Sequence, residues 1–301
     1  MSWARTSVGN TDELEQARLI ERRLQQGRLI RARFEIVSNR GVGSGSELAA
    51  DDEATKWMHL SHVVTTALMM ATDNMRAIDG LLRPAKTLEV PMYAHYPIVR
   101  SILEASSLAK WILVPAARGD RIERLLRARF DDIAQDASLA KVELDALQNM
   151  DEPPGNDVLG RQRRLDTKRH DRDVAKAREI AAAHDIPWAR VKQGLPPWVH
   201  LIRSVCVVPA GAHGMRVPGD YAAMLWKVAS GLSHPSHSRS ARNSDLERLS
   251  ESADGVSRVR LTASLRWTHE AILVAYNTTQ EAVSLLESRG APQLPASFHR
   301  R

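Results

Sequence analysis

The sequence has one cysteine, few aromatic residues and no long apolar run. Cys206 alone among 301 residues excludes an internal disulfide and a zinc site built from cysteines. Only 5% of the residues are aromatic. No apolar stretch approaches the roughly 20 residues that a membrane-spanning helix needs, and the first residues lack the apolar core of a signal peptide. We therefore expect a cytoplasmic protein without a membrane segment.

The composition favours helices and leaves the choice of partner open. Apolar residues make up 43% of the chain, which is enough for a sizeable core. The net charge of +6 is a small excess of 42 basic over 36 acidic residues. Such a balance permits nucleic-acid binding without requiring it.

Apolar residues recur at helical spacing over several long segments that glycine or proline interrupts. In the segment 51–82, the expected apolar face includes Trp57, Leu60, Val64 and Met75. We predict an all-α antiparallel bundle of five or six long helices with a charged, proline-rich crossover. The expected helices cover residues 11–36, 51–82, 97–112, 120–150, 219–232 and 262–288.

The remaining segments suggest how the chain is divided. We expect an N-terminal helix and flexible linker in 1–50, the bundle in 51–290 and a disordered tail in 291–301. Residues 161–179 carry dense charge of both signs, which indicates a solvated helix or a mobile crossover. The alternating residues 256–261 indicate a lone short strand.

Two segments contain residues that could carry chemistry. Arg100 and Glu104 lie four apart on an apolar helix, so we expect them to pair, either as an intrahelical salt bridge or as part of a polar pocket. His234 precedes Pro235, which places it at the C-terminal end of a helix. There it could serve as an acid, as a phosphate contact or only as a capping donor.

Motifs for metal or cofactor binding are weak or missing. His59 with His62, and His234 with His237, have three-residue spacing that could suit a shared zinc ion. The motifs Glu-x-x-His, His-Glu-x-x-His and Gly-x-Ser-x-Gly do not occur, nor does a dinucleotide glycine fingerprint. We expect neither a metal nor a cofactor.

The order Val99-Arg-x-x-x-Glu104 followed by Tyr221-x(8)-Ser-x-x-x-His234 resembles a group of uncharacterised all-helical bacterial proteins. That group is distantly similar to HEPN-type helical domains, and the resemblance covers about residues 90–290. It implies a ribonuclease of a defence system. The catalytic signature of those nucleases is an arginine followed four to six residues later by a histidine. The nearby match, Arg164 to His170, lies in the charged crossover and not on a core helix, so we do not assign it as an active site.

Two functions are consistent with these observations, and whether the chain is an enzyme stays open. The first is a module that binds a protein partner or dimerises, in a stress or defence context. The alternative is a HEPN-like, metal-independent ribonuclease or nucleic-acid-binding protein whose partner is RNA. In that case Arg100, Glu104 and His234 would be catalytic, with His234 as acid or base and Arg100 stabilising phosphate charge.

Overall fold

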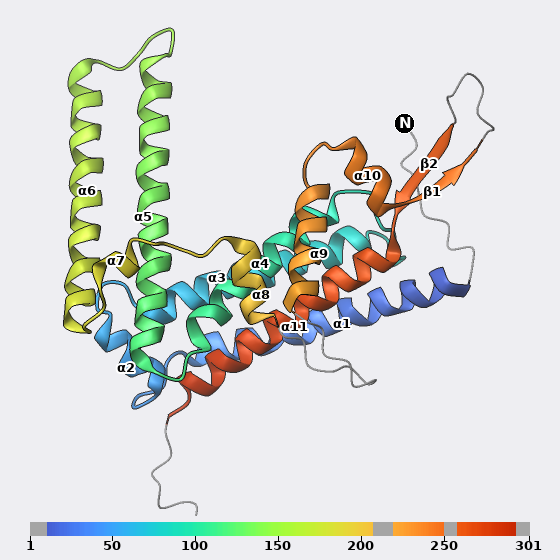
Figure 1. Cartoon of the computed structure of the whole chain (residues 1–301), viewed down its shortest axis with the longest axis horizontal. Coiled ribbons are helices and arrows are strands. Elements are labelled where there is room, and N and C mark those ends of the chain that lie inside the picture. The colour runs from blue at the N-terminus through green and yellow to red at the C-terminus, as the bar shows by residue number, and fades with distance from the viewer. Residues whose placement is uncertain (1–10, 207–218, 250–257, 293–301) are drawn as a thin grey trace, which may run out of the picture. The chain divides into compact units, whose positions relative to one another are not determined.

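The protein is described by a computed structural model that covers residues 11–206, 219–249 and 258–292 (Figure 1). Helices make up 76% and strands 3% of the structure, which confirms the all-α class. The chain packs as two compact units, one formed mainly by 11–43, 64–114 and 197–291, the other by 44–63 and 115–196. The domain ranges expected from the sequence stay a prediction, because packing alone does not show which part folds independently.

The first unit is built around α4 (His95–Leu113), of which 13 of 19 residues are buried. α4 packs against α11 (Leu265–Gly290), α8 (Trp198–Val205) and α9 (Gly219–Leu232), and α11 packs in turn against α1 (Thr11–Arg40). α3 (Leu60–Leu82) is joined to α4 by a hydrogen bond between Asn74 and Ser101. The apolar faces of these helices meet in one core because each has a continuous stripe to bury.

α1 and α11 approach closely at a glycine. A Cβ atom on Gly27 would lie 2.5 Å from Cε2 of Tyr276, a ring that is fully buried. No side chain larger than hydrogen fits there without moving the ring. Bridges from Arg33 to Glu287, at 2.6 Å, and from Arg28 to Asp79 of α3, at 2.9 Å, lie along the exposed side of α1.

The first unit also contains a small two-stranded sheet, between α10 (His237–Asn243) and α11 in the chain. β1 (Ser244–Arg248) and β2 (Val259–Ala263) pair in antiparallel register, with Ser244 opposite Ala263 and Leu246 opposite Leu261. α10 is a short helix that precedes β1. Of the strand predicted at 256–261, residues 256 and 257 lie outside the described ranges, and 259–261 belong to β2, which has a partner in β1 and is therefore not a lone strand.

The second unit is a long helical hairpin with a compact base. α5 (Arg118–Gln148) and α6 (Asn156–Ala183) run side by side, and α7 (Trp188–Val191) packs against both. A cluster that includes Ile122, Leu126 and Ile180 fills the base. The base also contains a buried ion pair, in which Arg121 of α5 binds the carboxylate of Asp51 through Nε at 2.6 Å and Nη2 at 2.9 Å.

The predicted helix 51–82 is two helices, α2 (Glu47–Ala54) and α3. A turn at Thr55–His59 separates them, and the Asp52 carboxylate accepts a hydrogen bond from the Ser61 backbone at the start of α3. Trp57, expected on the apolar face, lies in this turn with φ 76° and is 80% exposed. That prediction was wrong because the apolar spacing continues across the turn, whereas the caps that end α2 and begin α3 are polar.

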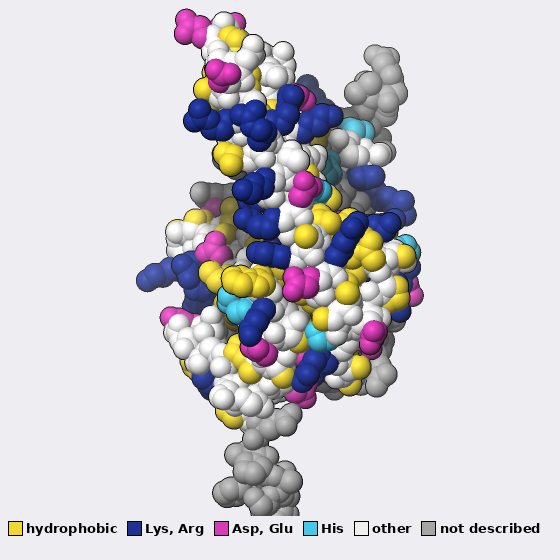
Figure 2. All heavy atoms as spheres, turned by 90° about the vertical axis from the view of Figure 1, so that its left-hand side faces the viewer, with side chains coloured by type: hydrophobic (Ala, Val, Ile, Leu, Met, Phe, Trp, Pro, Cys, Tyr) yellow, Lys and Arg dark blue, Asp and Glu magenta, His cyan; other side chains and the backbone are white. Residues whose placement is uncertain are grey.

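The charged segment 161–179 is the middle of α6, a helix of 28 residues. Lys and Arg side chains gather on the arm of the hairpin that faces the viewer in Figure 2. Among the described residues, no helix is long and apolar enough to cross a membrane.

Candidate functional sites

The ion pair predicted in α4 is present. Arg100 Nε donates to Glu104 Oε1 at 2.7 Å, and the two side chains are 28% and 19% exposed. They lie one helical turn apart at the border of the core, where the low exposure strengthens their attraction. This is the intrahelical salt bridge that the four-residue spacing favours.

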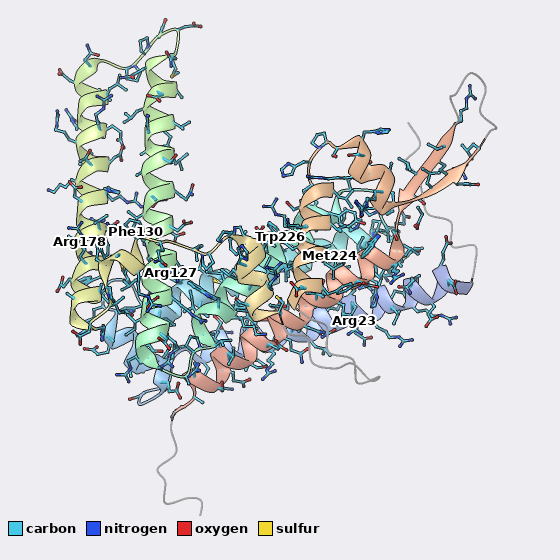
Figure 3. All side chains as sticks on the ribbon, viewed as in Figure 1. Arg23, Arg127, Phe130, Arg178, Met224 and Trp226 are labelled. Atoms are coloured by element: carbon cyan, nitrogen blue, oxygen red, sulfur yellow. The ribbon has the colours of Figure 1, made fainter. Side chains whose placement is uncertain are left out.

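A third residue joins this pair from another helix. The indole Nε1 of Trp226, on α9, donates to the same Glu104 Oε1 at 2.8 Å (Figure 3). The Arg100 guanidinium lies 5.6 Å from the centre of the Trp226 ring. Its two terminal nitrogens have no hydrogen-bond or ion-pair partner within the described ranges. The edge of the guanidinium that carries these two nitrogens is therefore available to an anion.

The third predicted site residue is not joined to this cluster by any contact that the structure records. His234 lies in a bend two residues after α9 ends at Leu232, and its side chain is exposed. Among the residues described, neither a hydrogen bond nor an ion pair links it to Arg100 or Glu104. A catalytic role for the three residues stays a prediction.

Of the two histidine pairs, His59 and His62 have a ring contact in the described structure. The rings of His59 and His62 lie 4.8 Å apart, and His237 is exposed at the start of α10. Within the part of the chain that the structure describes, no group of three or more His, Cys, Asp or Glu side chains could hold a metal ion.

Two groups of polar side chains inside the first unit are paired across its helices. Cys206 is buried between the hydroxyls of Ser107 and Thr278, and burial raises the pKa of its thiol. This agrees with the behaviour of an unreactive buried cysteine. Lys110, on α4, is bound by the Val205 carbonyl and the Glu281 carboxylate. These groups connect α4, α8 and α11 and leave no nucleophile exposed among themselves.

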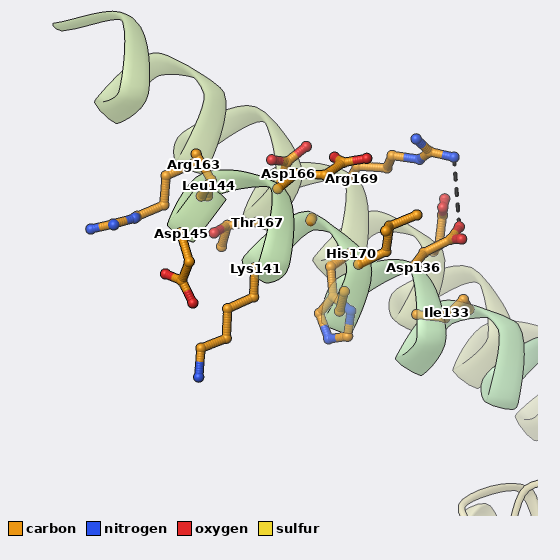
Figure 4. Close-up of a pocket in the computed structure, with 15 residues that line it drawn as sticks. Ile133, Asp136, Lys141, Leu144, Asp145, Arg163, Asp166, Thr167, Arg169 and His170 are labelled. Carbon is orange, nitrogen blue, oxygen red and sulfur yellow. Dashed lines mark ion pairs between the residues drawn. The ribbon is translucent and has the colours of Figure 1, made fainter. Parts of the chain in front are cut away.

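The second unit has a groove between α5 and α6. Near the base Ile133 is buried, and near the tip Leu144 and Leu159 are buried. Between these levels the facing side chains are small or polar, and they enclose a cavity of about 560 Å³ (Figure 4). The residues facing one another there include Ala137, Ala140, Asp166, His170 and Asp173.

The two sides of this groove differ. Arg169 and Asp136 form an ion pair at 3.7 Å on one side, while Lys141, Asp145 and Arg163 lie on the other (Figure 4). Sequence analysis missed the groove because it treated 161–179 apart from 120–150. A signal was present in the sequence of α5. Ala137 and Ala140 lie between Ile133 and Leu144 at intervals of four, three and four residues, so small residues occupy core positions there.

No family model, curated protein or solved structure matches this chain. The resemblance to HEPN-type proteins therefore stays a prediction, and the function must be argued from the two units themselves.

Proposed function

We propose that this protein is a dimerising module and that the α5–α6 hairpin is the surface through which a second copy binds. The proposal rests on the absence, within the residues described, of large apolar side chains between α5 and α6 along the middle of the hairpin. Ala137 and Ala140 cannot fill the space between the helices, which leaves the groove of about 560 Å³. Two helices alone bury too little apolar surface to be stable over such a length, and a bundle is the usual solution.

Large apolar side chains are exposed beside this groove. Leu139 is 57% exposed on α5, and Val158 and Leu165 are 57% and 56% exposed on α6. Leu139 lies three residues after Asp136, and Leu165 lies four before Arg169, which pairs with Asp136. Residues three and four apart share a helix face, so Leu139 and Leu165 lie on the same side of the hairpin. Val158 extends this apolar side by two turns.

The charges of the two helices suit a second copy. Residues 131–148 of α5 have five acidic side chains against one basic, whereas residues 156–173 of α6 have six basic against four acidic. A two-fold axis parallel to the helices places the α5 of one copy over the α6 of the other. The acidic helix then faces the basic helix twice, and Leu139 meets Leu165 of the second copy in a four-helix bundle.

The test is the mass of the particle in solution. Sedimentation equilibrium at tens of micromolar should give twice the 33.5 kDa of the chain. Leu165→Glu places a charge in the proposed contact and should give the monomer. Leu29→Glu, the same change at a leucine 69% exposed on α1, should leave the dimer intact. A monomeric parent, or equal effects of the two variants, would contradict the proposal.

A second function is favoured by the free edge of the Arg100 guanidinium. A guanidinium with unpartnered terminal nitrogens can bind a phosphate, as the ribonuclease alternative requires. Incubation with total RNA should then show cleavage that Arg100→Ala and His234→Ala abolish. Equal cleavage by all three proteins would exclude this site. A cytoplasmic setting and a stress or defence context belong with either proposal.

A further inference from the structure

A line of cations runs along the outer face of α6. Arg161, Arg164, Lys168, Arg172 and Lys176 follow one another at intervals of three, four, four and four residues, which is the period of one helix face. The first four are exposed and Lys176 is half-buried. At 1.5 Å per residue this basic stripe is about 22 Å long.

The basic stripe has few competing partners. Arg172 pairs with its neighbour Asp173 at 2.9 Å. Arg161, Arg164 and Lys168 form no ion pair with an acidic residue in the described part of the chain. Their side chains point away from α5, because Asp166 and His170, which line the groove, are on the opposite face of the helix. The cations are therefore available to a polyanion.

An exposed aromatic ring lies at the base end of the stripe. The ammonium of Lys176 is 5.1 Å from the centre of the Trp57 ring. Trp57 is 80% exposed and has a φ of 76°, a region that favours glycine. Both the exposed ring and the backbone conformation cost free energy in the free protein. A binding role would explain why a tryptophan occupies this turn.

We propose that the basic stripe and Trp57 form a binding surface for single-stranded nucleic acid. Phosphates would follow the cations of α6, and an unpaired base would stack on the indole ring. A duplex offers no free base face to Trp57, so the ring favours an unpaired strand over a double-stranded one. The length of the stripe suits a site of roughly four nucleotides, the small end of the range for such surfaces.

This surface does not rest on the dimer. The two surfaces meet on α6, because Leu165 lies four residues after Arg161 and three before Lys168. Trp57 lies at the base of the hairpin, beside Lys176, and belongs with the basic stripe alone. Leu139→Glu, on α5, separates the two proposals, since it should abolish dimerisation without placing a negative charge in the basic stripe, and should still bind the oligonucleotide.

The experiment measures the fluorescence anisotropy of labelled twelve-nucleotide oligo-dT and oligo-U, one arm for each source of single strand. The full chain should bind at 50 mM salt and weaken at least tenfold at 300 mM. Arg164→Gln together with Lys168→Gln should weaken binding about tenfold. Lys141→Gln, at an exposed lysine of α5 that lines the groove, is the matched control and should have a much smaller effect than Lys168→Gln alone.

Trp57 is tested by two substitutions that tolerate the turn differently. Trp57→Gly relieves the backbone at φ 76° and removes the ring, so it should weaken binding about tenfold without loss of stability. Trp57→Phe keeps a stacking surface and should restore most of the affinity. Polyglutamate and duplex DNA serve as competitors. The proposal is overturned if they compete as well as unlabelled oligo-dT, or if Trp57→Gly binds like the parent.

Discussion

At the scale of single residues, burial decides the charge of His95. This residue begins α4 with no exposed surface, and its Nε2 lies 2.9 Å from the hydroxyl of Thr268. Removal from water lowers the pKa of His95 to about 3. In the unfolded chain a histidine takes up its proton near pH 6.5. Between these two values the unfolded state binds the proton and the folded state does not.

The folded state therefore loses stability as the pH falls through this window. The change is about 1.4 kcal/mol per pH unit for one proton, or about 2 kcal/mol between pH 6.5 and pH 5. His95→Gln keeps a polar side chain but cannot titrate, so its free energy of unfolding should depend less on pH by about this amount. Urea unfolding at pH 7 and pH 5 measures it. The same change at the exposed His237 should keep the parent's pH dependence. If His95→Gln also kept it, burial of His95 would not be the cause of the loss of stability at low pH.

At the scale of elements, the contact between α1 and α11 depends on Gly27. The ring of Tyr276 occupies the space where a Cβ would be, at 2.5 Å, and is itself fully enclosed. Gly27→Ala must displace that ring, and overpacking of this kind costs about 1–3 kcal/mol. The higher helix propensity of alanine offsets at most about 1 kcal/mol. We expect a net loss of stability in denaturant unfolding.

Gly80 gives the matched control for this substitution. It lies in α3, is exposed, and a Cβ there would meet nothing within 4 Å. Gly80→Ala should leave stability unchanged or raise it by up to about 1 kcal/mol, because only helix propensity changes. If Gly27→Ala behaved in the same way, the close approach of α1 and α11 would have no energetic weight.

The long elements could be predicted from the sequence because each has a periodic apolar face bounded by glycine or proline. α9 was predicted with the bounds that the structure has, and the predicted helix 120–150 ends within two residues of Gln148, where α5 ends. The turn between α2 and α3 was not predicted, because the apolar residues keep their helical spacing across it. The pairing of β1 with β2 was also missed, because β1 is mostly polar and has no alternating pattern that marks it as a strand.

The candidate sites were only partly predictable for a related reason. Arg100 and Glu104 are four residues apart, so their pairing follows from helix geometry alone. Trp226 lies 122 residues after Glu104, and nothing local indicates that its indole donates to that carboxylate. The exposure of Trp57 likewise depends on a turn, not on a pattern. Local spacing predicts contacts within a helix, whereas contacts between helices depend on how the chain packs.

At the scale of the whole molecule, self-association should couple stability to protein concentration. A dimer that forms only from folded chains is favoured by mass action, and each tenfold rise in concentration above the dissociation constant contributes about 1.4 kcal/mol per dimer, or about 0.7 kcal/mol per chain. For a chain of 301 residues this corresponds to a rise in Tm of roughly 1 °C for each tenfold rise in concentration. Leu165→Glu should remove the dependence, whereas Leu29→Glu should retain it.

Self-association should slow hydrogen exchange in a defined part of the chain. The proposed contact involves residues 131–173, so hydrogen exchange in that hairpin should slow as concentration rises, more than in α4 or α11 of the first unit. Polar, alanine-rich helix pairs open readily when nothing covers them, so the hairpin's outer half should exchange fastest in Leu165→Glu. A Tm that stays constant over a hundredfold range of concentration, with equal exchange in both proteins, would leave the exposed Leu139, Val158 and Leu165 without a second copy to cover them.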